Sequence, residues 1–389
     1  MMKILMVTRE NQADRRYGLG RSLAPLIDEF SRRNIVVDYA CQNDLGVRSK
    51  IWQRKLHNLL SSLFAKFNTN TDFSVLFSVL LERLNMGRIA AKIAAKHGHT
   101  HVHCHDPIIA AGFFFFSCFH LRLNARWGVT EHGFGCYTDA IHADGVRLGS
   151  LVMCWMRYWE ARTLLAASWV VSPTRSAMEQ ILIDLNMDSL PITWQPIYHA
   201  RPVLNTYSKE ESRRLLGWQD DVFYVLGIGR IAPVKQFPML IDACAKLNNQ
   251  ADIQLVILGE GESNDLLSLG KTLGLERDIV FATTDDVSPY LYAADLYVST
   301  SASESFGLAN LEAMTAGLAS ICTAVGGVPE VMGNGALLVQ PELDALISAL
   351  KYLMEDKNAR EAIAQQGLKR ANDWPDIMEI ANNYEKIYQ

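Results

Sequence analysis

Short apolar segments alternate with amphipathic, helix-like segments along almost the whole chain. The apolar segments in the first half are 3–8, 35–40, 100–104, 125–130 and 169–171. Those in the second half are 222–228, 255–258, 279–281, 296–299 and 320–323. Strands that are apolar on both faces and separated by helices are typical of parallel sheets built from βαβ units. The pattern predicts an α/β fold.

This alternation is interrupted between 190 and 209, where Pro191 and Pro196 bracket a short strand. A chain of 389 residues is long enough for two domains. We therefore predict Rossmann-like domains at 1–198 and 199–372, and a C-terminal helix at 373–389 that returns to the first domain. Ligands of open α/β sheets bind beyond the carboxyl ends of the strands, so we expect a site in a cleft between the domains.

Composition excludes some classes of protein. The formal net charge of −5 argues against broad nucleic-acid binding. Seven scattered cysteines without a CxxC pair favour reduced thiols and a cytoplasmic location. The apolar start at 1–7 is too short for a signal peptide and predicts a strand. The apolar segment 108–119 is too short to span a membrane, so we expect a buried helix there.

A glycine-containing turn follows the predicted strand 222–228 and precedes a predicted helix that begins near 236–238. It carries Gly229, with the cations Arg230 and Lys235 beside it. Glycine lets a ligand approach the backbone, and the N-terminus of a helix attracts anions. A diphosphate fits this combination, since arginine binds two oxygens at once and lysine acts as a point charge. The alternative is a plain turn with two surface cations.

Two acids, Glu304 and Glu312, mark the start of a further predicted helix after the strand 296–299. Free N–H groups near Gly307 and Leu308 are suited to a phosphate. A carboxylate at Glu312 can accept hydrogen bonds from both hydroxyls of a ribose, as acids do in dinucleotide sites. The alternative makes Glu304 a partner of the helix dipole and Glu312 a solvated side chain.

These segments resemble those of one family. The segment ESFGLANLEAMTAGLASICTAVGGVPEVM, which begins at Glu304, is similar to the donor-site signature of the GT-B retaining glycosyltransferases of family 4. Arg230 and Lys235 match that family's phosphate-contacting residues, and the segments 257–261 and 294–296 match it as well. The resemblance is close from 224 to 338 and looser in the N-terminal half. It implies the GT-B fold, in which two Rossmann-like, doubly wound domains face a cleft.

The resemblance also implies roles for single residues. Arg230 and Lys235 would bind the donor diphosphate, Glu312 the ribose, and Glu304 the transferred sugar. The base would lie against the loop 283–287. We expect the donor to be bound by Gly18, Gly20, Gly229, Arg230, Lys235, Thr284, Glu304, Phe306, Gly307, Leu308 and Glu312. We expect catalysis to depend on His132, Glu304, Arg230 and Lys235.

Two of these expectations concern the N-terminal domain. His132 follows the predicted strand 125–130, and a histidine after this strand contacts the donor sugar in the family; a histidine bonded to loop backbone is the alternative. The loop 15–21 contains Gly18 and Gly20 where many relatives have adjacent glycines, which makes the match looser.

Five histidines alternate with other residues from His97 to His105. On a strand, His101, His103 and His105 would share one face, which raises the question of a metal site. We favour a partly exposed strand edge without a metal. His105, at the tip of the strand, is a second candidate residue for the cleft.

A helix is predicted at 48–67, with an apolar stripe flanked by cations. It could dock on an anionic membrane surface and meet a lipid-linked acceptor, or it could pack on its own sheet. The stripe consists of Trp52, Leu56, Leu59, Leu60, Leu63 and Phe67, and the cations are Lys50, Arg54, Lys55 and Lys66.

The expected reaction moves a sugar, with retention, from a nucleoside diphosphate sugar to a hydroxyl of a glycan or lipid-linked acceptor. UDP is the first expectation for the nucleotide and GDP the second. The cations and a helix N-terminus would stabilise the leaving diphosphate, so no metal or other cofactor is expected. The family suggests bacterial surface polysaccharide or glycolipid assembly, in the cytoplasm or at the inner face of the plasma membrane.

Three other functions compete with this interpretation. Gly227-x-Gly229-x-x-Ala232 matches a dinucleotide fingerprint, but Pro233 and Lys235 follow it at once. A sugar-nucleotide epimerase on the same architecture would convert the donor without an acceptor. A non-catalytic sugar-nucleotide-binding subunit would bind the donor without turnover.

Overall fold

The computed structural model describes residues 2–10, 18–64, 72–121, 123–143, 145–248, 252–275 and 279–389. The chain divides into two compact units, Met1–His199 with Ile377–Gln389, and Ala200–Asp376. The boundaries expected from the sequence, at 198 and 372, lie within a few residues of these divisions. We expect the first domain to bind the acceptor and the second to bind the nucleotide sugar, and these roles stay predictions.

The first unit contains a parallel sheet with the strand order β2-β1-β3-β4-β5-β6. Its strands are β1 (Lys3–Val7), β2 (Val36–Ala40), β3 (His101–Cys104), β4 (Arg126–Thr130), β5 (Trp169–Ser172) and β6 (Trp194–Pro196). Its helices are α1 (Gly18–Arg32), α2 (Val47–Phe64), α3 (Phe73–His97), α4 (Pro107–Ser117), α5 (Tyr137–Ala143), α6 (Ser150–Ala166), α7 (Arg175–Asp184) and α16 (Ile377–Tyr388), with a 3-10 turn η1 (Gln42–Asp44).

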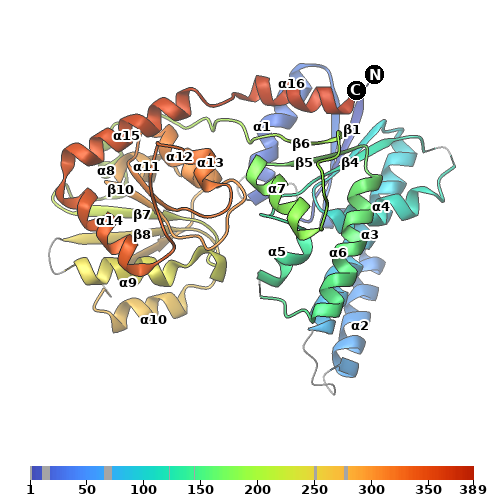
Figure 1. Ribbon diagram of the computed structural model, residues 1–389, viewed down its shortest axis with the longest axis horizontal. Helices are drawn as coiled ribbons and strands as arrows, with labels where there is room; N and C mark the ends of the chain where they lie inside the picture. Colours follow the sequence, from blue (N-terminus) through green and yellow to red (C-terminus); the bar gives the residue numbers. More distant parts are fainter. Residues whose placement is uncertain are drawn as a thin grey trace. The chain divides into compact units, whose positions relative to one another are not determined.

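Helices α3 and α4 pack closely on one face of this sheet (Figure 1). Two glycines permit the contact, because a Cβ on Gly87 would lie 2.3 Å from the backbone nitrogen of Phe113, and one on Gly112 would lie 2.7 Å from the carbonyl oxygen of Leu84. Buried side chains such as Val102 on β3 fill the space between helices and sheet. On the other face, α16 packs beside α1.

The second unit contains a parallel sheet with the order β12-β11-β10-β7-β8-β9. Its strands are β7 (Phe223–Ile228), β8 (Ile253–Leu258), β9 (Ile279–Ala282), β10 (Leu296–Ser299), β11 (Ser320–Thr323) and β12 (Leu337–Val339). Its helices are α8 (Lys209–Leu216), α9 (Phe237–Leu247), α10 (Asn264–Thr272), α11 (Ser288–Ala293), α12 (Leu308–Thr315), α13 (Val328–Met332), α14 (Leu343–Glu355) and α15 (Lys357–Asn372), with a 3-10 turn η2 (Pro233–Lys235). The chain reverses its direction of winding between β7 and β10, which makes the sheet doubly wound.

The predicted α/β fold with two doubly wound units is confirmed, and so is the C-terminal helix that packs on the first unit. The expectation of a buried helix at 108–119 is wrong in part. α4 buries Ile109 and Phe113 against the sheet, but Phe115 and Phe119 expose 59% and 69% of their surface. Among the described residues, no helix is long and apolar enough to cross a membrane.

Candidate active site

The turn after β7 in the second unit is held by backbone hydrogen bonds to the loop after β8. The N–H of Gly229 donates to the carbonyl of Leu258 at 2.9 Å, and the N–H of Ile231 donates to that of Glu260 at 2.8 Å. A Cβ on Gly259 would lie 1.9 Å from the carbonyl oxygen of Gly229. Only glycine fits there, so the sequence allows the two loops to meet.

Lys235 and Glu304, two of the predicted site residues, are brought together by the loop after β10. The hydroxyl of Thr300 donates to the carbonyl of Lys235 at 2.8 Å, and the N–H of Ala302 donates to that of Val234 at 2.7 Å. The Nζ of Lys235 then lies 2.6 Å from Oε2 of Glu304. Ser301 donates its hydroxyl to the same carboxylate at 3.3 Å. Both charged side chains remain partly exposed, so a ligand can reach them.

Helix α12 begins at Leu308, a few residues after Glu304, on the carboxyl side of β10. Gly307 is its N-cap, with a φ of 82° that favours glycine. A Cβ there would also lie 2.5 Å from Nδ2 of Asn310. This Nδ2 is buried without a hydrogen-bond partner, whereas the Oδ1 of Asn310 accepts from the hydroxyl of Tyr297 at 2.8 Å. The sequence did not single out Asn310, because a buried amide leaves no motif.

The remaining predicted residues of this unit differ in exposure. Glu312 is only 2% exposed, so its interpretation as a solvated side chain is wrong. Phe306 is buried against Trp374, with 5.8 Å between ring centroids, so only its backbone is available to a ligand. Arg230 is exposed and makes no ion pair with a described residue. Thr284 accepts from the N–H of Asp286 at 3.1 Å and is half-buried.

His132 lies in the first unit, beyond the end of β4. Its Nε2 lies 2.9 Å from Nδ1 of His105, which follows the neighbouring strand β3. The ring of His199 is parallel to that of His132, with 6.1 Å between centroids. Burial holds the pKa of both His132 and His105 well below the usual value, so both rings are neutral at pH 7. A neutral imidazole has one donor and one acceptor, which suits hydrogen bonding to a sugar hydroxyl.

The other histidines of β3 are used within the fold. His103 bonds to the hydroxyl of Tyr388 through Nδ1 and to that of Thr130 through Nε2, both at 2.7 Å. His101 lies 2.8 Å from the backbone carbonyl of Tyr388. The interpretation as a partly exposed strand edge is wrong, because β3 lies between β1 and β4 and α16 covers these side chains.

A buried acid lies beside the histidine pair. Glu131 follows β4 directly and is buried, and its Oε1 has no hydrogen-bond partner. Burial raises its pKa well above the usual value, and Glu160 and Asp106 nearby raise it further. Glu160 accepts from the N–H groups of Tyr137 and Thr138 at the start of α5. Glu131 was not predicted from the sequence, because an acid at the end of a strand has no distinguishing pattern.

Two further features of the first unit bear on the predictions. Gly18 and Gly20 lie in the first turn of α1, and the N–H of Gly20 donates to Oε1 of Glu10 at 3.0 Å, so this donor is already used. The residues 11–17 of the same predicted loop lie outside the described residues. Among the described residues, Cys136, Asp139 and Asp184 lie close enough together to be candidate metal ligands. Asp139, however, forms an ion pair with Arg157.

Comparison with known proteins identifies the family of the chain. Residues 208–370 match the family of glycosyl transferases group 1. An uncharacterized glycosyltransferase of Methanocaldococcus jannaschii is 31% identical over 269 residues, which cover 64% of this chain and 69% of the relative. The O-antigen chain mannosyltransferase B of Escherichia coli is 32% identical over 182 residues, covering 44% of this chain and 45% of the relative.

The fold is also found among solved structures. HepE of Anabaena in complex with UDP and glucose superposes with a TM-score of 0.70 at 17% identity, over 99% of each chain. At this identity the likeness shows the fold, and the sequence relatives show the family. The chain therefore belongs to the glycosyl transferases of group 1, and its two doubly wound units form the GT-B fold.

Proposed function

We propose that this glycosyltransferase moves a sugar from a nucleoside diphosphate sugar to a hydroxyl of a glycan or lipid-linked acceptor, with retention of anomeric configuration. The observation that carries the proposal is the 2.6 Å contact between Lys235 and Glu304 at the start of α12. It places a cation, a carboxylate and a helix N-terminus at the carboxyl edge of one sheet. These are the groups that a diphosphate and an attached sugar require.

The second unit supplies the groups for the leaving diphosphate. As the bond between the anomeric carbon and the diphosphate oxygen breaks, negative charge grows on that oxygen. Arg230, Lys235 and the N-terminus of α12 stabilise this charge, and no metal is needed for the purpose. The acceptor oxygen bonds to the anomeric carbon on the face that the diphosphate leaves, and the proton of the acceptor passes to a diphosphate oxygen. No protein nucleophile is assigned.

Glu312 is the proposed ligand of the ribose hydroxyls, and His132 of the donor sugar. A buried carboxylate strongly prefers partners that donate hydrogen bonds, which a ribose provides. UDP is the first candidate nucleotide and GDP the second; the UDP bound to HepE supports this order. The E. coli relative acts on an O-antigen chain by its name, which supports a glycan acceptor and a role in surface polysaccharide or glycolipid assembly.

The alternative function, a dinucleotide-dependent oxidoreductase, is less well supported by the turn after β7. In the Rossmann fingerprint the glycine-rich turn opens directly into a helix. Here the 3-10 turn η2 lies between Gly229 and α9, and it presents Lys235 instead of a helix N-terminus.

Calorimetric titration with UDP-, GDP- and ADP-sugars tests the proposal. The wild type should bind one nucleotide class, and Glu312→Gln should weaken that binding by about 10–100-fold. Glu355→Gln, on the exposed face of α14, is the matched control. Once an acceptor that supports turnover is found, NMR of the product should show the same anomeric configuration as the donor sugar, as retention requires. Conversion of the donor without acceptor would identify an epimerase, and binding without turnover across a broad acceptor panel would identify a binding subunit.

A further inference from the structure

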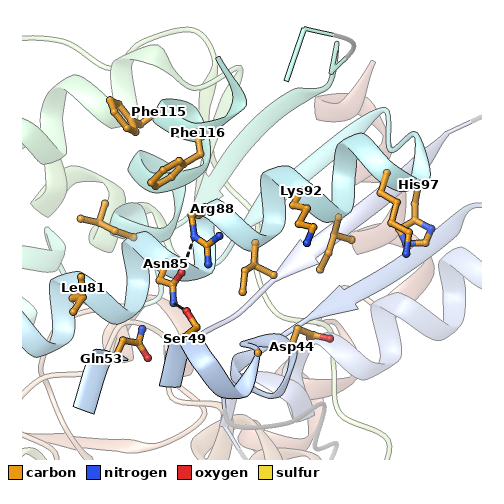
Figure 2. Close-up of a pocket in the computed structure, with 15 residues that line it drawn as sticks. Asp44, Ser49, Gln53, Leu81, Asn85, Arg88, Lys92, His97, Phe115 and Phe116 are labelled. Atoms are coloured by element: carbon orange, nitrogen blue, oxygen red, sulfur yellow. Dashed lines mark hydrogen bonds between the residues drawn. The ribbon is translucent and has the colours of Figure 1, made fainter. Parts of the chain in front are cut away.

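A groove of about 1380 Å³ runs between helices α2, α3 and α4 of the first unit (Figure 2). Its lining includes apolar and basic side chains, together with polar residues such as Ser49 and Asn85. The apolar members are Leu81, Leu84, Ile89, Ile93, Phe115 and Phe116. The basic members are Arg88, Lys92, Lys96 and His97.

The cations of this groove form a stripe along α3. Arg88, Lys92 and Lys96 are four residues apart and therefore lie on one face of the helix. All three are exposed, and none forms an ion pair with a described residue. Asp44 also lines the groove, but its Oδ2 accepts from the backbone N–H of Cys41 at 2.8 Å. The stripe therefore keeps its positive charge available to a ligand.

One of these cations is held in place by neighbours from two helices. The Nε of Arg88 donates to Oδ1 of Asn85 at 2.9 Å, and the Nδ2 of Asn85 donates to the hydroxyl of Ser49 at 2.5 Å. Figure 2 shows this chain of bonds crossing from α3 to α2. The two terminal nitrogens of the guanidinium remain available, and these bind two oxygens of a phosphate.

The apolar part of the groove lies across Arg88 from Ser49. Phe115 and Phe116 extend from α4 on that side (Figure 2), and Phe115 exposes 59% of its surface. An exposed phenyl ring beside cations that form no ion pair with a described residue suits a molecule with a hydrocarbon part and an anionic part. A small soluble anion would use the cations and leave the rings uncovered.

The charge of the whole segment points the same way. Residues 47–97, which include α2 and α3, contain nine Lys and Arg and two Asp and Glu. This segment therefore has a formal net charge of +7 in a chain whose net charge is −5. Such segregation of charge favours an anionic surface over a neutral one.

We propose that this groove binds an anionic phospholipid of a membrane surface. Arg88 and Lys92 bind the phosphate of the head group, and Leu84, Phe115 and Phe116 contact its hydrocarbon chains. Membrane contact was expected from the stripe of α2. Leu56 and Leu60 of that stripe are half-buried and Leu59 is 56% exposed, and the exposed cations of α3 and Phe115 of α4 extend the surface.

The groove is separate from the candidate site of the same unit. Lys96 and His97 lie at the amino edge of the sheet, where Nζ of Lys3 donates to the carbonyl of His97 at 3.1 Å. His105 and His132 follow the carboxyl ends of β3 and β4. Lipid binding can therefore be measured without sugar transfer, and it can fail or succeed whether or not the proposed reaction is right.

Cosedimentation of the full chain with vesicles tests the proposal. Vesicles of phosphatidylcholine with an equal part of phosphatidylglycerol should bind the protein, and vesicles of phosphatidylcholine alone should not. The double variant Arg88→Glu/Lys92→Glu should lower the partition coefficient at least about tenfold. Lys351→Glu/Lys357→Glu on α14 and α15, with the same change in charge, should bind as the wild type does.

A second pair of variants separates the groove from a general surface charge. Phe115→Ser should also reduce binding several-fold, whereas Ile183→Ser, at an equally exposed apolar position on α7, should not. Thermal unfolding confirms that each variant is folded. Equal binding by Arg88→Glu/Lys92→Glu and wild type overturns the proposal. Unchanged binding by Phe115→Ser also overturns it. So does the loss of vesicle binding on addition of inorganic phosphate at constant ionic strength, because a free anion would then suffice.

Discussion

Nζ of Lys235 lies 2.6 Å from Oε2 of Glu304, although 69 residues separate them in the chain. The proposed function assigns the first to the donor diphosphate and the second to the transferred sugar. The ion pair partly neutralises both side chains and holds them in contact. The part of the proposed donor site that binds the diphosphate therefore lies next to the part that binds the transferred sugar.

Replacement of Lys235 by Met should lower kcat/KM by about 10²–10³-fold, because charge on the leaving diphosphate loses its nearest cation. Glu304→Gln should have a smaller effect, and the double variant should fall short of the sum of the two free-energy changes. Lys246→Met, which removes an exposed cation from α9, is the control. Additive effects in the double-mutant cycle would show that the two side chains act independently.

Gly259→Ala should distort the turn that carries Gly229. The added methyl group would lie 1.9 Å from the carbonyl oxygen of Gly229, so one loop has to move. We expect a loss of stability of about 1–3 kcal/mol, typical of overpacking, together with weaker nucleotide binding. Urea unfolding and calorimetry measure the two. Gly46→Ala, where a Cβ meets nothing within 4 Å, should change neither. An unperturbed Gly259→Ala would mean that the loops are not tightly apposed.

The contribution of His103 to the stability of the first unit should fall as the pH drops below about 6.5. Burial lowers the pKa of His103 from 6.5 to about 3, so the unfolded chain takes up a proton that the folded chain refuses. The contribution of this group is therefore fully present above about pH 6.5 and is lost progressively down to about pH 3, on the order of 5 kcal/mol. Denaturant unfolding between pH 7 and 4 measures it.

His103→Gln removes this titration and should reduce the loss of stability between pH 7 and 4, at some cost in stability at pH 7. His142→Gln replaces an exposed histidine and should leave the dependence as it is in the wild type. A His103→Gln variant whose stability depends on pH as steeply as that of the wild type would contradict the burial of a neutral His103.

Tyr388→Phe should destabilise the protein by about 1–3 kcal/mol, because Nδ1 of His103 loses its partner at a site closed to water. Tyr352→Phe, at an exposed position on α14, should cost little. Equal stability of the two variants, measured by urea unfolding, would show that another group satisfies His103.

Features that depend on neighbours in the sequence could be predicted. Alternation of apolar and amphipathic segments located the strands β1 to β5 and β7 to β11, since buried parallel strands carry that signal themselves. The turn at Gly229 and the helix start at Gly307 were recognised for the same reason. Strand β12 was missed, because its three residues are too few for a periodicity.

Features that depend on distant segments could not be predicted. The histidines of β3 indicated a strand edge, and only the packing of α16 shows why they are buried. Likewise Glu312 is an ordinary helix residue in the sequence, and its burial follows from the fold of the second unit. The exposure of Phe115 could not be predicted from its apolar character. Consecutive apolar residues in a helix point in all directions, and the sheet buries only one side of α4.

The contact of Tyr388 with His101 and His103 also has a consequence for the order of synthesis. On the ribosome, β1 to β6 emerge long before α16, with the whole of residues 200–376 in between. Until then, α16 is missing from that face, and the imidazoles of His101 and His103 lack Tyr388 as a partner. The first unit to be translated is thus the last to be completed, and a nascent chain that stalls in the second unit would present this open face to chaperones.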